Sequence, residues 1–107
     1  MLPQKQRIHS SKEVLTVLKK GIKCRYNSLT LFYLPQTIQG IRATVIVDKK
    51  VSKLAVRRNR LKRQLRALLQ THSLRPGLYI VRGYPGAEKL SFEGLSAEWQ
   101  QLLRRQP

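Results

Sequence analysis

Acidic residues are scarce in this sequence. Five aspartates and glutamates stand against 22 lysines and arginines in 107 residues, which leaves a formal net charge of +17. A nuclease that works with hard cations needs carboxylates gathered at one place. The acids here are instead scattered along the chain, at Glu13, Asp48, Glu88, Glu93 and Glu98. We therefore expect no catalytic residues and no metal ligands in the protein itself.

Cysteine and long apolar runs are also nearly missing. Cys24 is the single cysteine, which excludes an intrachain disulfide and a cysteine-based zinc site and fits a reducing compartment. The longest apolar stretch, around residues 29–34, is far too short to span a membrane. The N-terminal segment MLPQKQRIHSSKE has no apolar core of the kind found in signal peptides. We expect a cytoplasmic protein without membrane contact.

Positive charge is what the sequence has in excess. An imbalance this large is typical of chains that bind a polyanion, since the cations otherwise repel one another. Nucleic acid is the favoured partner, and an anionic membrane surface is the alternative. Apolar residues make up 41% of the chain, too many for a disordered basic tail. We expect residues 1–107 to form a single RNA-binding domain, with residues 1–9 extended.

Periodicity and turn residues predict an α+β fold, in which helices cover a small mixed sheet. The expected segments are a helix at 11–20, strands at 28–34 and 41–48, a helix at 54–70, a strand at 77–83 and a helix that begins after Ser91. Ser10 and Glu13 form a candidate capping box, and Ser52 is a candidate N-cap. The continuous apolar run at 45–47 favours a central place for its strand, whereas Arg25 and Tyr26 are expected in a loop.

The helix expected at 54–70, LAVRRNRLKRQLRALLQ, carries the clearest functional pattern. It contains no glycine, proline or acid, and its apolar stripe is narrow, consisting of Leu61, Leu65, Leu68 and Leu69. A merely solvated helix usually mixes Glu with Lys at i,i+4 spacing, and this one does not. Arginine forks pair with phosphate in a bidentate way. The pattern predicts nucleic-acid contact, with a solvated face or a membrane-surface helix as alternatives.

The stretch KKVSKLAVRRNRLKRQLR, residues 49–66, resembles the basic signature of the bacterial ribonuclease P protein family. In that family, paired lysines end a strand, an alanine follows, and then come Arg-Asn-Arg, an apolar residue, Lys-Arg and a further arginine. The matching positions are Lys49, Lys50, Ala55, Val56, Arg58, Asn59, Arg60, Leu61, Lys62, Arg63 and Arg66. The order of elements over residues 7–34 and 78–105 agrees as well. Val14 and Leu18 depart from frequent aromatics, and Ser52 departs from a common glycine.

The resemblance implies a small α/β sandwich with a left-handed βαβ crossover and a heterodimeric complex with a catalytic RNA. That RNA would use bound Mg²⁺ to remove the 5′ leader of precursor tRNA, and the protein would bind RNA and lower the magnesium requirement. Implied RNA contacts are Lys49, Lys50, Lys53, Arg58, Asn59, Arg60, Lys62, Arg63 and Arg66. Val14, Leu18 and Phe32 match the family's leader cleft, and Phe32 suits either base stacking or plain core packing.

Three other functions are consistent with parts of the pattern. A structural RNA-binding protein, such as a ribosomal one, would share the charge and architecture. A stand-alone nuclease would have to rely on His9 and His72, which lie in expected loops without a neighbouring carboxylate. A DNA-binding module would place the basic helix in a major groove, but the chain shows no helix-turn-helix spacing. The residues at 49–66 favour the ribonuclease P interpretation over all three.

Overall fold

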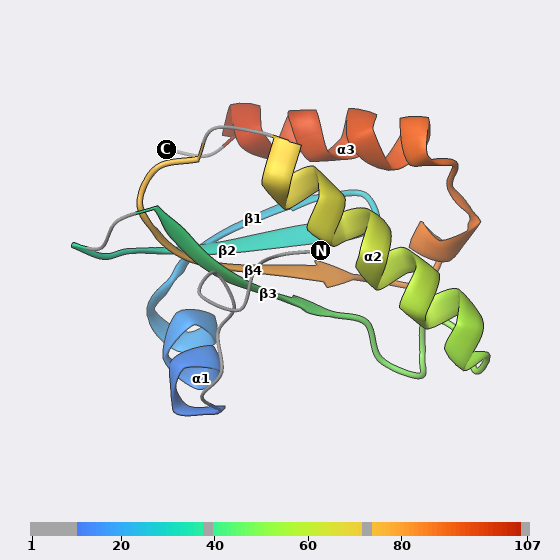
Figure 1. Cartoon of the computed structure of the whole chain (residues 1–107), viewed down its shortest axis with the longest axis horizontal. Coiled ribbons are helices and arrows are strands. Elements are labelled where there is room, and N and C mark those ends of the chain that lie inside the picture. The colour runs from blue at the N-terminus through green and yellow to red at the C-terminus, as the bar shows by residue number, and fades with distance from the viewer. Residues whose placement is uncertain (1–10, 38–39, 72–73, 106–107) are drawn as a thin grey trace.

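The computed structural model of the chain describes residues 11–37, 40–71 and 74–105 (Figure 1). The expected extended segment at 1–9, Ser10, His9 and His72 lie outside these ranges. The elements are α1 (Ser11–Lys20), β1 (Ile22–Tyr26), β2 (Leu29–Pro35), β3 (Ile41–Ile46), α2 (Ala55–Thr71), β4 (Gly77–Gly83), η2 (Ala87–Lys89) and α3 (Phe92–Arg105). The α+β prediction is confirmed: α1, α2 and β4 begin and end within about one residue of expectation, and α3 begins after Ser91 as expected.

The four strands form one mixed sheet in the order β1-β2-β4-β3. β1 pairs with β2 and β2 with β4 in antiparallel fashion, whereas β3 and β4 are parallel. The chain must therefore cross over between β3 and β4, and α2 is the connection, because parallel neighbours cannot be joined by a tight hairpin. This is the expected βαβ unit, and the left-handed sense of its crossover connection stays a prediction.

α2 and α3 cover one face of the sheet. The core of that layer holds the apolar stripe of α2 together with Leu95, Trp99 and Leu102 of α3, packed against alternate residues of the strands. Tyr33 and Tyr79 stack inside it with ring centroids 4.8 Å apart. Burial of these side chains fixes α2 on the sheet and leaves its opposite side to solvent.

α1 lies against the other face, below one end of the sheet in Figure 1. Val17 is its fully buried residue and packs with Phe32, Leu78 and Ile80 of the strands. The helix ends at Gly21, where a side chain could not fit, because a Cβ would lie 2.5 Å from the Val17 carbonyl oxygen and 3.1 Å from that of Tyr33. This close approach sets where α1 leaves the sheet.

Two sequence expectations about the strands are wrong. Arg25 and Tyr26 belong to β1 rather than to a loop: Cys24 and Tyr26 are half-buried against the main core, whereas Lys23 and Arg25 are exposed on the other face. β3 is an edge strand, not a central one, and ends at Ile46. Its buried residues alternate with partly exposed ones, as they do where only one face of a strand meets a core.

The two later helices begin differently: a side-chain cap begins α3, whereas the expected cap of α2 lies before the helix. The Ser91 hydroxyl accepts a hydrogen bond from the Gly94 N–H at 3.1 Å, so Ser91 caps α3 as expected. Ser52 is not the N-cap of α2, because the helix begins at Ala55. Its hydroxyl instead accepts a hydrogen bond from the Leu54 N–H at 3.2 Å, and the Leu54 carbonyl receives the first helical bonds.

Candidate RNA interface

A tight turn after β3 presents the paired lysines. The Asp48 carbonyl accepts the Val51 N–H at 3.1 Å, and the Asp48 side chain accepts the Lys50 N–H at the same distance. Lys49 and Lys50 therefore stand at the tip of the turn, where both are exposed. Asp48 thus has a local structural role as well as a place at the end of the strand.

Arg58 braces the segment that leads into α2. Its Nη1 donates to the Ser52 carbonyl at 2.9 Å and to the Lys53 carbonyl at 3.0 Å. The side chain is half-buried. A guanidinium has five N–H donors, so these two hydrogen bonds use only some of them. Arg58 therefore holds the turn in place, and its contact with RNA stays a prediction.

The expected RNA contacts lie along α2 and the turn that precedes it. The helix has 17 residues and is about 25 Å long at 1.5 Å per residue. Of the expected RNA-contacting residues, the exposed ones are Lys49, Lys50, Lys53, Asn59, Arg60 and Arg63, and the half-buried ones are Arg58, Lys62 and Arg66. The ion pairs found among the described residues, Arg42–Glu13 and Arg82–Asp48, use none of these cations. We call these nine residues the basic surface.

Arg57 was not among the expected contacts, although the structure exposes it. With Arg60 and Gln64 of α2 and Glu88 and Lys89 of η2 it lines a groove of about 340 Å³. The doublet of arginines at 57 and 58 was the sequence signal for it. Arg57 lies on the η2 side of α2 because of the way the helix packs, and no local sequence pattern predicts that packing.

The three expected leader-cleft residues meet where α1 packs on the sheet: Val14 and Leu18 belong to α1 and Phe32 to β2. Val14 and Leu18 are half-buried, and Phe32 is only 6% exposed, within the cluster around Val17. The Lys23 ammonium lies 5.9 Å from the centroid of the Phe32 ring. A groove of about 330 Å³ beside α1 has other walls, which include Glu13, Leu34, Arg42 and Leu78. Phe32 thus contributes to packing, and its contact with a leader stays a prediction.

Most of the acids accept hydrogen bonds from other groups of the protein. Glu13 pairs with Arg42 at 3.1 Å, and Glu98 accepts hydrogen bonds from the N–H and hydroxyl of Ser28 at 3.1 and 2.9 Å. Glu88 accepts the Gly86 N–H at 3.1 Å. Over residues 11–37, 40–71 and 74–105, no three side chains of His, Cys, Asp or Glu gather at one place. None of the described helices is long and apolar enough to cross a membrane.

This combination of a basic crossover helix and a mixed four-stranded sheet agrees with one family of known proteins. The family model described as Ribonuclease P matches residues 2–106, which is nearly the whole chain. The chain belongs to the ribonuclease P protein family. Its resemblance at residues 49–66 is therefore part of a similarity that spans the sequence, and membership ties it to an endoribonuclease complex of tRNA processing.

Relatives from bacteria agree in sequence and in fold. The ribonuclease P protein component of Syntrophomonas wolfei is 32% identical, over 98% of this chain and 90% of its own length. That of a Pseudanabaena species is 42% identical, over 76% of this chain and 72% of its own. The RNase P protein structure of Staphylococcus aureus superimposes with a TM-score of 0.85 at 22% identity, over 92% of this chain and 93% of that one. This last similarity concerns the fold alone.

Proposed function

We propose that this ribonuclease P protein assists a catalytic RNA in removing the 5′ leader of precursor tRNA in the cytoplasm. The catalytic RNA contacts the basic surface, and the single-stranded leader runs along the face of the sheet that carries α1. The observation that supports the proposal best is α2, whose cations between Arg57 and Arg66 are presented along about 14 Å of helix without an acidic partner among the described residues. A row of donors of that length suits successive phosphates.

The protein's own residues do not suit a Mg²⁺ site. A hard cation takes several oxygen ligands at one place, whereas the described carboxylates are separated and most of them accept hydrogen bonds from neighbouring groups. We therefore assign the Mg²⁺ of the reaction mainly to the RNA. The protein's net charge of +17 offsets repulsion between catalytic RNA and substrate, so less free Mg²⁺ is needed to hold the two together.

The decisive experiment is cleavage of a precursor tRNA at low magnesium with the protein alone, a cognate catalytic RNA alone, and both together. We expect the mature 5′ end to form mainly in the mixture. Tight RNA binding without any stimulation would favour a structural RNA-binding role. Cleavage by the protein alone would mean that it carries an active site of its own.

Phe32 offers a test of leader binding. Since the ring is buried, we choose Phe32→Leu, which keeps most of the apolar volume but removes the aromatic face. Stacking of a base on an aromatic ring contributes about 1–3 kcal/mol, so the affinity of the holoenzyme for leader-bearing precursor should fall by about five- to 150-fold. Binding of mature tRNA should not change. Equal losses for the two RNAs would leave Phe32 with a packing role only.

A further inference from the structure

The groove between α2 and η2 combines hydrogen-bond donors with acceptors. Its volume of about 340 Å³ is near the small end of the range for ligand clefts, which is about 300–1,000 Å³. One side is a single face of α2, because residues at i, i+3, i+4 and i+7 lie together on a helix, and η2 packs beside it. The groove therefore has room for one nucleotide. The residues that line it are Arg57, Arg60, Leu61, Gln64, Glu88 and Lys89.

A hydrogen-bonded turn positions the η2 side of the groove. Ala87 is fully buried, and its N–H donates to the Tyr84 carbonyl at 3.0 Å. The Gly86 carbonyl accepts the Lys89 N–H at 3.1 Å, and Gly86 has a φ of +107°, a left-handed conformation that favours glycine. Glu88 and Lys89 are therefore presented from a fixed turn, so a ligand that enters the groove has little of the backbone to order.

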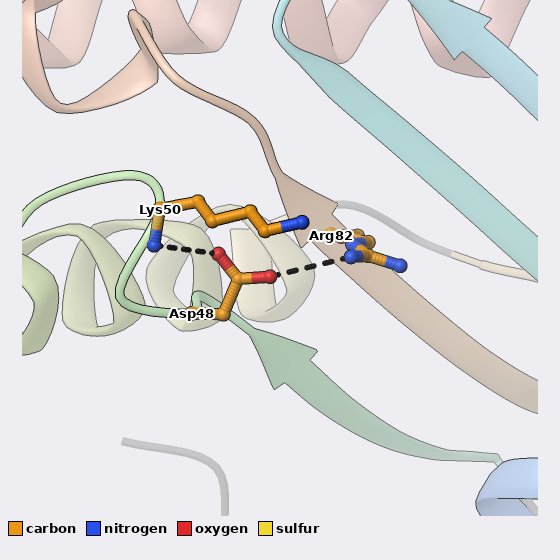
Figure 2. Close-up of polar contacts among 3 residues, drawn as sticks. All are labelled: Asp48, Lys50 and Arg82. Atoms are coloured by element: carbon orange, nitrogen blue, oxygen red, sulfur yellow. Dashed lines mark hydrogen bonds and ion pairs between the residues drawn. The ribbon is translucent and has the colours of Figure 1, made fainter.

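Glu88 is a carboxylate that can still accept hydrogen bonds. Its Oε2 accepts the Gly86 N–H at 3.1 Å, and no cation in the part of the chain that the structure describes forms an ion pair with it. Asp48, the acid that precedes the basic surface in the chain, differs. One of its oxygens accepts the Lys50 N–H and the other accepts from Arg82 Nη2 at 3.3 Å (Figure 2). A carboxylate has about four acceptor sites, so Glu88 keeps Oε1 and part of Oε2 for a ligand.

A carboxylate among cations suits an RNA base better than a phosphate alone. The negative charge of Glu88 opposes a phosphate, since like charges across an interface are unfavourable. Guanine carries two adjacent N–H donors on the Watson–Crick edge, N1–H and N2–H, which match the two oxygens of a carboxylate. Its O6 and N7 are acceptors that arginine and lysine bind. Adenine, cytosine and uracil do not have N–H donors on two adjacent atoms of that edge, so the lining of the groove fits guanine best.

We propose that this groove binds an unpaired guanine nucleotide of the catalytic RNA. The Glu88 carboxylate accepts N1–H and N2–H of the base, and Arg57 and Arg60 donate to its O6 and N7 or to the adjoining phosphates. Arg60 also belongs to the basic surface, so an RNA that follows α2 passes the groove. Exposed edges of unpaired bases are the usual means by which proteins read RNA sequence. The proposal rests on the proposed function and adds base recognition to a surface that otherwise contacts phosphates.

The sign of one substitution tests the proposal. Glu88→Gln removes a negative charge beside the RNA, which by itself would strengthen the binding of a polyanion. If Glu88 accepts from guanine, the Kd for a cognate catalytic RNA should instead rise about five- to tenfold. The glutamine oxygen can still accept the Gly86 N–H, so Tm should stay unchanged. Titration of the RNA with wild-type and variant protein, with Tm measured alongside, gives both quantities.

Glu93→Gln is the matched control. Glu93 is exposed in the first turn of α3 and does not line the groove, so its replacement makes the same change in net charge at another place. This variant should bind the catalytic RNA as tightly as wild type or slightly more tightly. A Glu88→Gln protein that behaves like Glu93→Gln would overturn the proposal, because the groove would then meet only phosphates.

Inosine locates the guanine in the RNA. It lacks the 2-amino group of guanosine and therefore one of the two donors that Glu88 accepts. Catalytic RNA transcribed with a small fraction of inosine in place of guanosine is mixed with protein, and bound and unbound RNA are separated. We expect a position at which inosine is depleted from the wild-type complex but not from the Glu88→Gln complex. Equal depletion at every position in the two complexes would contradict recognition by Glu88.

Free nucleotides separate this proposal from the proposed function. Wild-type protein alone, titrated with guanosine or inosine monophosphate and followed by its amide chemical shifts, should bind the guanosine nucleotide about five- to tenfold more tightly. Both nucleotides carry the same phosphate, so general attraction to the protein is equal. Equal affinities would overturn the guanine site, even in a protein that stimulates cleavage. A wild-type protein that does not stimulate the catalytic RNA would defeat the proposed function, and the nucleotide preference would still be measurable.

Discussion

Replacing Trp99 with alanine should destabilise the protein by about 3–5 kcal/mol, the usual cost of removing a large aromatic side chain from a core. Trp99 is 0% exposed and belongs to the cluster that joins α3 to the sheet and to α2. Domains of this size are stable by only about 5–15 kcal/mol in total. The substitution therefore removes a large part of the free energy of unfolding. It also loosens the core on which α2 packs.

Urea unfolding followed by circular dichroism measures this destabilisation directly. Phe92→Ala is the matched control, because Phe92 is an aromatic residue of the same helix with 42% of its surface exposed. Its replacement should cost less than about 1 kcal/mol. Similar effects of the two substitutions would mean that α3 contributes little through Trp99.

The double variant Arg60→Ala, Arg63→Ala should weaken binding of the catalytic RNA about 100-fold at moderate salt. Both residues are exposed on α2, so their removal should hardly change stability. A hydrogen bond between charged groups contributes about 1.5–3 kcal/mol, and a protein that binds two fewer phosphates should also have a log–log salt slope smaller by about 2. Filter binding or fluorescence titration at several salt concentrations gives both quantities.

The control must remove the same charge elsewhere. Lys19→Ala with Lys20→Ala does so at the exposed end of α1. If this control weakens binding as much as the α2 variant does, net charge rather than the basic surface drives assembly. Arg58 is left unchanged in this test, since its bonds to the Ser52 and Lys53 carbonyls would mix weaker RNA binding with a disrupted turn.

The elements with strong local patterns were predictable from the sequence. α2 has good helix formers, a clear apolar stripe and no breaker, and it was expected within one residue of its ends. β4 lies between turn residues and is rich in apolar and aromatic side chains, and its bounds were expected correctly. Both are cases in which propensity and tertiary packing agree.

β1 and β3 show where local patterns stop being sufficient. β1 alternates apolar residues with Lys23 and Arg25, which is the period-2 pattern of a strand with one covered face, but the pattern is only five residues long and was not used to predict a strand. The run at 45–47 looked like a central strand, yet Val47 is buried just after β3 has ended. Whether a strand is central depends on which strands pair with it, and the sheet order is a property of the whole chain.

The same distinction applies to the candidate sites. The basic surface was predictable because its residues lie close together in the sequence, between Lys49 and Arg66. Arg57 and Lys89 line one groove although 32 positions separate them, and only the packing of α2 beside η2 brings them together. No local pattern in the sequence linked the two residues.

The position of β4 determines when the protein can fold during its synthesis. β4 lies between β2 and β3, and its pairs include Leu29 with Gly83, residues far apart in the chain. A nascent chain has completed β2, β3 and all the cations of α2 before the strand that joins them exists. Non-local pairing of this kind closes late and slowly. Any product that ends before Gly77 therefore lacks the middle of its sheet rather than an edge, and it leaves the ribosome with a basic helix that has no sheet to pack against.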